Sequence, residues 1–211
     1  MNKTNVLILF CILSSLTVWF IGDQTLLNNL VFSGENLQKG MIWTVITGIF
    51  LHADIFHLGG NMIFFYIFGN TIENELEQKW VIIPFFCGGI GAFLFSLFYY
   101  PPNVQMLGAS AAIFTLTAIV MLLKPLKFSF IFLMPLGLVA IMYFFFNIIE
   151  FYYGTQGNIS YIGHLIGFII GVPFGIASSK QWQKNLIITI GLFTIYLIIV
   201  YVLYPTLVNI F

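Results

Sequence analysis

The chain has 211 residues, of which 60% are hydrophobic and only 7% are charged, and its formal net charge is zero. In soluble domains about a quarter of the residues are charged, so this composition excludes a protein surrounded by water on all sides. No run of basic residues is present, and we therefore expect no nucleic-acid partner. The apolar residues form continuous blocks long enough to cross a hydrocarbon core of about 30 Å, which indicates an all-α, polytopic membrane bundle in contact with the lipid bilayer rather than a barrel.

The apolar blocks predict seven membrane-spanning helices. The first block ends in the bulky residues Trp19, Phe20 and Ile21, where signal-peptide cleavage needs small ones, so we expect a retained helix. The stretch 22–55 is mixed in polarity and predicts a partly ordered loop in the membrane interface, with Trp43 as an anchor. The predicted spans are 5–21, 56–74, 80–99, 109–123, 128–149, 159–178 and 185–204.

The lysines predict the orientation of the chain. If the N-terminus is cytoplasmic, only Lys39 lies on the outer side, and the other six lysines share the inner side: Lys3, Lys79, Lys124, Lys127, Lys180 and Lys184. Because basic residues collect on the cytoplasmic side, we expect a multi-pass protein of the cell membrane with its C-terminus outside. The absence of arginine, with abundant Ile, Phe, Asn and Lys, indicates an AT-rich prokaryotic genome.

Three polar residues of different spans are predicted to lie at one depth. A helix over 110–123 would be about 21 Å long, so its outer end, with Ser110, lies about 10 Å below the outer surface. His164 lies about 24 Å of helix before Lys180, the lysine that ends its span. Asn61 lies about 27 Å of helix before Lys79 in the same way. Polar side chains are costly in lipid, so a shared layer in the outer half of the membrane indicates a functional site.

The residues around Ser110 favour a nucleophile over a structural serine. A lone serine in a membrane helix more often bonds to its own helix. Here the segment Gly108-Ala109-Ser110-Ala111-Ala112 follows a proline-rich loop, so Ser110 is predicted to begin a helix. Free N–H groups and the positive end of the helix dipole at that position are suited to an oxyanion.

His164 lies in a helix with a glycine every fourth residue. Gly163, Gly167, Gly171 and Gly175 predict a close-packing seam of the small-xxx-small type. Such a seam would also let the His164 helix approach Ser110 closely enough for a Ser–His hydrogen bond. A metal would need further ligands at this depth, where only His57 is available, and we expect neither a metal nor another cofactor.

His57 and Asn61 are four residues apart and therefore share one helix face. Their side chains are suited either to hydrogen bonds between helices or to donation toward a developing oxyanion. His52 and Asp54 precede this helix and are predicted to be loop residues with access to water.

Three motifs resemble those of the rhomboid intramembrane serine proteases, in the family's order and over residues 40–178. The motifs are His57-Leu58-Gly59-Gly60-Asn61 in a stretch ending Phe68-Gly69-Asn70-Thr71-Ile72-Glu73, then Gly108-Ala109-Ser110, and then Gly163-His164-Leu165-Ile166-Gly167. The resemblance implies that Ser110 is the nucleophile and His164 its general base. It further implies that Asn61, His57 and the Ser110 backbone N–H bind the oxyanion.

The resemblance also implies a partner class and a domain organisation. The expected substrates are transmembrane proteins, cut near the outer face after a small residue. Residues 1–178 would form a six-helix protease core, and residues 179–211 a connecting loop with an extra seventh helix. The sequence departs from the family's common residues at four positions, with Ala111 for glycine, Gly163 for alanine, Phe114 for tyrosine and Thr44 for arginine.

The expected mechanism is acyl transfer by a Ser–His dyad. Glu150 is the carboxylate nearest in depth, and we do not expect it to complete a triad. Residues 152–154 (Tyr152, Tyr153 and Gly154) are a candidate lid over the site.

Two alternative functions are a proteolytically inactive relative that binds transmembrane clients and a transporter. Against the second, charged residues are few and no inverted repeat is evident. The sequence does not predict the oligomeric state.

Overall fold

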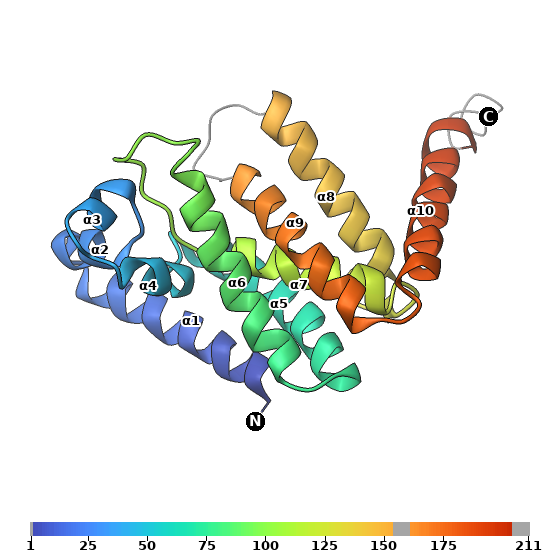
Figure 1. Ribbon diagram of the computed structural model, residues 1–211, viewed down its shortest axis with the longest axis horizontal. Helices are drawn as coiled ribbons and strands as arrows, with labels where there is room; N and C mark the ends of the chain where they lie inside the picture. Colours follow the sequence, from blue (N-terminus) through green and yellow to red (C-terminus); the bar gives the residue numbers. More distant parts are fainter. Residues whose placement is uncertain (1, 154–160, 204–211) are drawn as a thin grey trace.

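The computed structural model describes residues 2–153 and 161–203 of the chain. This part consists of α-helices, one short hairpin and a final π-helical turn, η1 (Figure 1). The elements are α1 Lys3–Ile21, α2 Gln24–Leu30, α3 Gly34–Gln38, α4 Thr44–Phe50, α5 Ile55–Glu75, α6 Lys79–Ser96, α7 Ser110–Leu123, β1 Phe128–Ser129, β2 Met134–Pro135, α8 Leu136–Tyr153, α9 Tyr161–Ser178, α10 Trp182–Ile198 and η1 Ile199–Leu203.

The predicted helical membrane bundle is confirmed, because every predicted span overlaps a helix of 14 residues or more. Within the described residues, five helices are long and apolar enough to cross a membrane, namely α1, α6, α8, α9 and the continuous α10–η1 segment. Helix α5 has 21 residues but carries histidine, asparagine and glutamate side chains, and α7 has only 14 residues. The count of seven crossings, with six in a core, therefore stays a prediction.

The prediction for the fifth span was wrong at its start. Residues 128–135 form a small antiparallel hairpin, in which Phe128 pairs with Pro135, and α8 begins only at Leu136. Proline has no N–H for a helix and disfavours helical backbone in the residue before it, so Pro135 limits α8 at this end. The hairpin is itself apolar and exposed, with Phe130 85% exposed, and hydropathy alone does not distinguish it from a helix.

The stretch 22–55 is more ordered than a partly ordered loop, since it holds α2, α3 and α4. Asp23 and Ser33 cap α2 and α3 by accepting backbone N–H bonds, as short polar residues commonly do. Phe32 exchanges two backbone hydrogen bonds with Met106, at 3.1 and 2.7 Å. These bonds attach the first loop to the segment that leads into α7.

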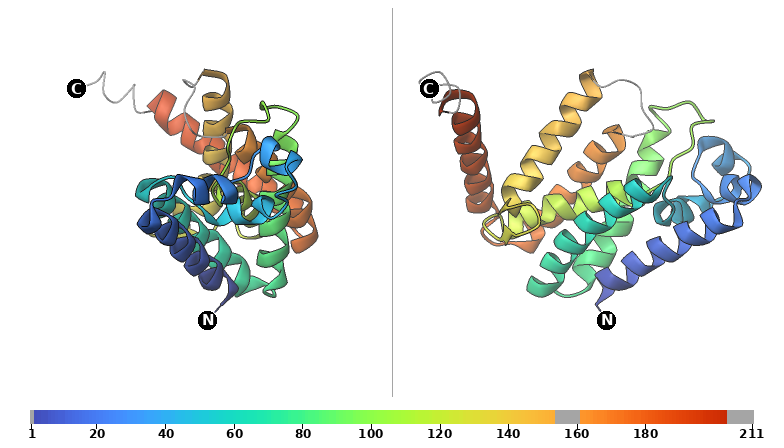
Figure 2. Two further views of the ribbon diagram at one scale, coloured as in Figure 1. Left: turned by 90° about the vertical axis from the view of Figure 1, so that its left-hand side faces the viewer. Right: turned by 180° about the vertical axis from the view of Figure 1, so that it is seen from behind.

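Helix α7 lies in the centre of the bundle, between α5, α6, α8 and α9 (Figures 1 and 2). Every residue from Ala111 to Leu122 is buried. A helix that is apolar on all sides can pack against lipid or against other helices, and α7 is enclosed by the helices around it. Because α7 begins at Ser110, this serine stands at the end of the most enclosed element of the fold.

The end of α5 holds the start of α1. The Glu73 carboxylate accepts the backbone N–H groups of Lys3 and Thr4, each at 2.8 Å. A carboxylate at a helix N-terminus accepts bonds from the free N–H groups and interacts favourably with the positive end of the helix dipole. Asn70 accepts a further bond from the Asn2 side chain. The stretch 68–73 therefore fixes the position of α5, the helix that carries His57 and Asn61.

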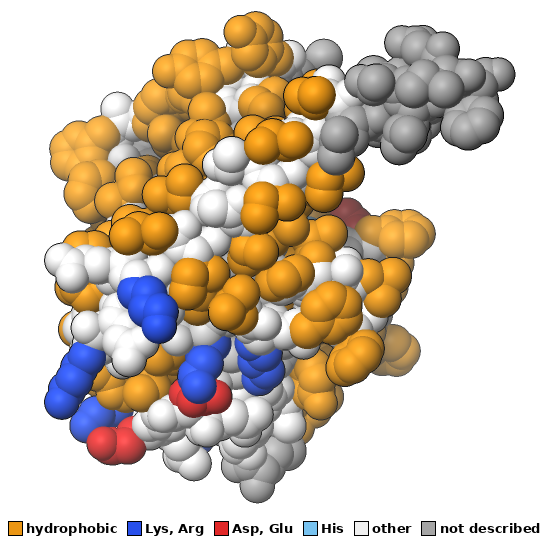
Figure 3. Space-filling model, turned by 90° about the vertical axis from the view of Figure 1, so that its right-hand side faces the viewer, with side chains coloured by type: hydrophobic (Ala, Val, Ile, Leu, Met, Phe, Trp, Pro, Cys, Tyr) orange, Lys and Arg blue, Asp and Glu red, His pale blue; other side chains and the backbone are white. Residues whose placement is uncertain are grey.

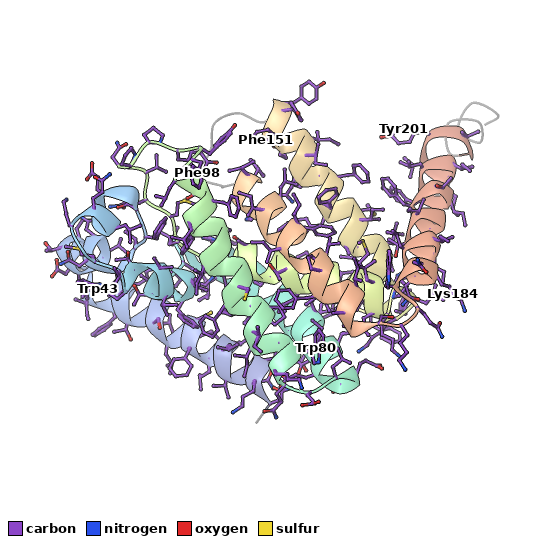
Figure 4. All side chains as sticks on the ribbon, in the orientation of Figure 1. Trp43, Trp80, Phe98, Phe151, Lys184 and Tyr201 are labelled. Carbon is purple, nitrogen blue, oxygen red and sulfur yellow. The ribbon has the colours of Figure 1, made fainter. Side chains whose placement is uncertain are left out.

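The predicted inner side has a matching physical end in the structure. In Figure 3, lysine and acidic side chains gather at the lower end of the molecule, below a broad apolar band. Lys124 bonds to Glu75 at 2.8 Å, which brings the ends of α7 and α5 together. Figure 4 shows Trp80 and Lys184 toward this end and Phe98, Phe151 and Tyr201 toward the other. Which end faces the cytoplasm stays a prediction.

Candidate active site

Ser110 and His164 are in direct contact. The Ser110 Oγ lies 2.7 Å from the His164 Nε2, a distance typical of a strong hydrogen bond. Ser110 is the first residue of α7, and His164 lies in the first turn of α9. His164 is buried and Ser110 is half-buried.

The close approach of α9 to α7 depends on glycine. A Cβ on Gly167 would lie 2.1 Å from the Ala111 carbonyl oxygen, and one on Gly171 would lie 2.3 Å from that of Thr115. The Thr115 hydroxyl then donates to the Gly167 carbonyl at 2.7 Å. Glycine at these positions lets the two backbones pack together, and His164 reaches Ser110 across this contact.

Asn147 of α8 is the site residue that sequence reasoning missed. Its Oδ1 lies 2.7 Å from the His164 Nδ1, and its side chain is only 1% exposed. The available signal was an asparagine in the middle of an apolar span, where a polar side chain needs a partner. Glu150, one turn later, interacts instead with Tyr161, so the carboxylate does not occupy the third position beside His164.

Two aromatic rings support His164 from one side. Phe114 stacks on the imidazole with ring centroids 4.6 Å apart and planes 9° apart. Tyr143 stacks on the far face of this arrangement, 4.5 Å from the Phe114 ring. Phenylalanine at position 114 therefore supplies a flat surface that restricts the tilt of the imidazole.

The turn before Ser110 passes directly over the polar residues of α5. Gly108 has a φ of +116°, which L side chains rarely adopt. A Cβ there would meet the His57 ring at 3.0 Å and would lie 3.9 Å from the Asn61 Nδ2. That Nδ2 is buried and has no hydrogen-bond partner among the described residues. Asn61 thus presents an unused donor near the start of α7.

The Asp54 carboxylate explains why His57 lies where it does. Asp54 is exposed, as predicted, and caps α5 by accepting the N–H groups of Phe56 and His57, both at 2.8 Å. This cap fixes the backbone of the first turn of the helix, from which the His57 side chain projects.

The prediction of a water-exposed His52 was wrong, since its side chain is only 2% exposed. The His52 ring contacts the Ser15 hydroxyl through Nδ1 at 3.2 Å and the Ala109 N–H through Nε2 at 3.5 Å. Burial, together with the neighbouring His57, lowers the pKa of His52 to about 3. Neutral His52 can accept a bond from Ala109, so this loop residue supports the backbone just before Ser110.

Part of the candidate lid can be described. Tyr152 and Tyr153, at the end of α8, are 73% and 86% exposed, whereas Gly154 lies outside the described residues. A lid function stays a prediction. Within the residues that the structure describes, no three His, Cys, Asp or Glu side chains are grouped as metal ligands would be.

Comparison with known proteins places these motifs in a family, since a model described as the Rhomboid domain matches residues 39–181. The chain belongs to the rhomboid family. The resemblance stated from the motifs is thereby confirmed, and together with the apolar helices it identifies a multi-pass membrane protein.

Three similar proteins have curated names. The chain is 28% identical over 165 residues to RHOMBOID-like protein 12, mitochondrial, of Arabidopsis thaliana, covering 69% of this chain and 49% of the relative. It is 39% identical over 79 residues to Rhomboid-like protein 11, chloroplastic, of the same plant, covering 37% and 28%. It is 28% identical over 80 residues to Rhomboid protease GlpG of Salmonella newport, covering 38% and 29%.

The chain thus spans about half of the first relative's length and less than a third of the other two. These relatives come from plant organelles and from a bacterium, so the prokaryotic origin of this chain stays a prediction. The division into a core of residues 1–178 and an extra segment 179–211 also stays one, although the family match ends close to that boundary.

Proposed function

We propose that this rhomboid protein is an intramembrane serine endopeptidase with Ser110 as nucleophile and His164 as general base. The proposal rests above all on the 2.7 Å contact between the Ser110 Oγ and the His164 Nε2. A nucleophile and base within hydrogen-bond distance, with the nucleophile at a helix N-terminus, form the arrangement that acyl transfer requires. The name of the similar Salmonella protein, a rhomboid protease, supports the same activity.

In the proposed reaction, the His164 Nε2 accepts the Ser110 proton while Oγ attacks the scissile carbonyl carbon. The carbonyl oxygen becomes an oxyanion, which the Ser110 N–H, the Asn61 amide and the His57 ring stabilise. When the C–N bond breaks, imidazolium at His164 returns the proton to the leaving amine. A water molecule, deprotonated by His164, then hydrolyses the Ser110 acyl ester and restores the free enzyme.

The unpartnered Asn61 Nδ2 supports this oxyanion role over a purely structural one. A buried donor without an acceptor costs stability, so a ligand oxygen that arrives during the reaction would gain a strong bond there. Its position beside Gly108, two residues before Ser110, suits an oxyanion formed on a carbonyl that Ser110 attacks.

The proposed substrates are transmembrane segments of other membrane proteins, cut near the outer face after a small residue. The short α7 supports a cut site below the outer surface, because its 14 residues span about 21 Å of a hydrocarbon core of about 30 Å. This assignment includes the predicted orientation, with the N-terminus in the cytoplasm and the C-terminus outside.

Fluorophosphonate labelling of the purified full-length protein tests the proposal. Wild-type protein should be labelled and should cleave a transmembrane model substrate, and both Ser110→Ala and His164→Ala should abolish cleavage. Ser178→Ala is the matched control, because within the described part of the chain the Ser178 hydroxyl bonds to its own helix, at the Gly175 carbonyl. Cleavage that persists in Ser110→Ala would exclude this mechanism. A wild-type protein that binds but never cleaves transmembrane segments would favour the inactive client-binding alternative.

A further inference from the structure

The Asn147 side chain joins α8 to the candidate base, and these two helices lie side by side in Figures 1 and 2. The orientation of its amide follows from its two partners. The Nδ2 donates to the Tyr143 carbonyl at 2.8 Å, and a carbonyl can only accept. The Nδ2 must therefore point to Tyr143, which leaves the Oδ1 facing the His164 Nδ1 at 2.7 Å.

This orientation determines the tautomer of His164. An amide oxygen can only accept, so the His164 Nδ1 must carry the ring proton and donate it to Asn147. The lone pair then resides on Nε2, which faces the Ser110 hydroxyl at 2.7 Å. In the opposite tautomer, two acceptors would face each other at the Asn147 contact, and Nε2 would donate to the Ser110 Oγ instead of being free to accept its proton.

We propose that Asn147 is a positioning residue, which holds His164 in the tautomer and orientation needed to accept the Ser110 proton. The inference rests on the proposed protease function and extends the Ser–His pair to a Ser110–His164–Asn147 arrangement. Both Asn147 and His164 are buried, so water does not compete for the Nδ1 proton.

A neutral amide is suited to this position in a membrane. A carboxylate in the same place would stabilise the imidazolium more strongly, but an unpaired charge inside a span is costly. The amide oxygen orients the ring and accepts its proton without adding a charge. Among the described residues, His57 on α5 and Tyr161 on α9 are the titratable neighbours of His164. Tyr143 and Glu150 on α8 lie behind Phe114 and Tyr161, respectively.

Three variants of the full-length protein test the role, and none of them alters those titratable groups. Asn147→Leu removes the acceptor but keeps the size of the side chain, and we expect kcat to fall about 100-fold with little change in KM, as for a misplaced catalytic group. Asn147→Asp keeps an acceptor oxygen and should recover much of the rate. Its added charge should also move the acidic limb of the pH–kcat profile to higher pH.

Thr117→Val is the matched control, since Thr117 is equally buried and its hydroxyl, among the described residues, bonds to the Ile113 carbonyl of its own helix, about two turns beyond Ser110. It should leave kcat unchanged. An Asn147→Leu variant with the wild-type kcat, or a loss in Asn147→Leu that Thr117→Val reproduces, would overturn the proposal.

A readout that needs no activity separates this inference from the proposed function. The ¹⁵N resonances of His164, assigned by their loss in His164→Gln, should show a protonated Nδ1 in wild type and a mixture of tautomers in Asn147→Leu. An unprotonated Nδ1 in wild type would overturn the role of Asn147 even in an active enzyme. The expected tautomer in a protein that never cleaves would instead remove the proposed function and leave the Asn147 contact established.

Discussion

The Asn61 Nδ2 is a buried donor for which no described residue supplies an acceptor. Side chains of this kind normally reduce stability, because the group has lost its water and gained nothing in return. Within the proposed mechanism, the same amide gains an acceptor only when the oxyanion forms. Activity and stability should therefore respond to Asn61 in different ways.

We expect Asn61→Ala to lower kcat by about 100- to 1000-fold, which is the effect of removing one oxyanion donor. The KM should change little, since the donor acts on the transition state. The melting temperature should not fall, because the substitution removes an unsatisfied polar group. Steady-state cleavage and thermal unfolding in detergent measure the two effects. A drop in melting temperature that accounts for the lost activity would contradict the oxyanion role.

At the level of elements, the site depends on the contact between α7 and α9. Gly167 faces the Ala111 carbonyl, and the Thr115 hydroxyl bonds across to the Gly167 carbonyl at 2.7 Å. Ala111 stands immediately after Ser110, so its backbone is both the floor of this contact and the start of the catalytic helix. A change in the helix spacing here would move His164 relative to Ser110.

Gly167→Ala should separate α7 from α9, since the added Cβ would lie 2.1 Å from a backbone oxygen that has little room to shift. Overpacking of this kind costs about 1–3 kcal/mol, and we expect a lower melting temperature together with slower fluorophosphonate labelling. Gly191→Ala on α10 is the control, because a Cβ there lies more than 4 Å from the other residues that the structure describes. It should be neutral or stabilise by about 0.5–1 kcal/mol. Equal effects of the two variants would argue against a close-packed seam.

At the level of the whole molecule, α10 lies at the edge of the bundle beside α8 (Figure 1). Only 6% of the apolar segment that α10 forms with η1, Trp182–Val202, is buried. It is nevertheless bonded to the core, as the Asn185 Nδ2 donates to the Leu122 carbonyl at 2.7 Å and the Thr189 hydroxyl to that of Met121 at 3.4 Å. These carbonyls belong to the end of α7, where a helix leaves its last acceptors free.

A chain shortened to residues 1–178 should therefore keep Ser110 labelling but unfold at a lower temperature. In the full-length chain, Asn185→Ala should reproduce part of this loss, about 0.5–1.5 kcal/mol for one hydrogen bond. Labelling and thermal unfolding of the two variants provide the measurement. Loss of labelling in the shortened chain with an intact fold would show that residues 179–211 belong to the protease core.

The residues that sequence reasoning found and missed differ in one physical respect. Ser110, His164 and Asn61 could be related to one another because helix rise converts sequence distance into depth. Asn147 and His52 could not, because depth does not specify which way a helix is rotated or how a loop folds back. Asn147 contacts His164 only in the rotation that α8 adopts, and His52 is buried only because its loop packs against α1 and the segment before α7.

The sequence by itself determined the membrane bundle, the approximate limits of its long helices, the family and the Ser110–His164 pair. The length of an apolar run, the capping residues and the local motifs are properties of the chain itself and do not depend on tertiary contacts. The tertiary structure decided the hairpin before α8, the burial of His52, the open donor on Asn61 and the contact of Asn147 with His164. Each of these features depends on contacts between side chains of elements that are far apart in the chain. Helix rotation and close packing determine those contacts.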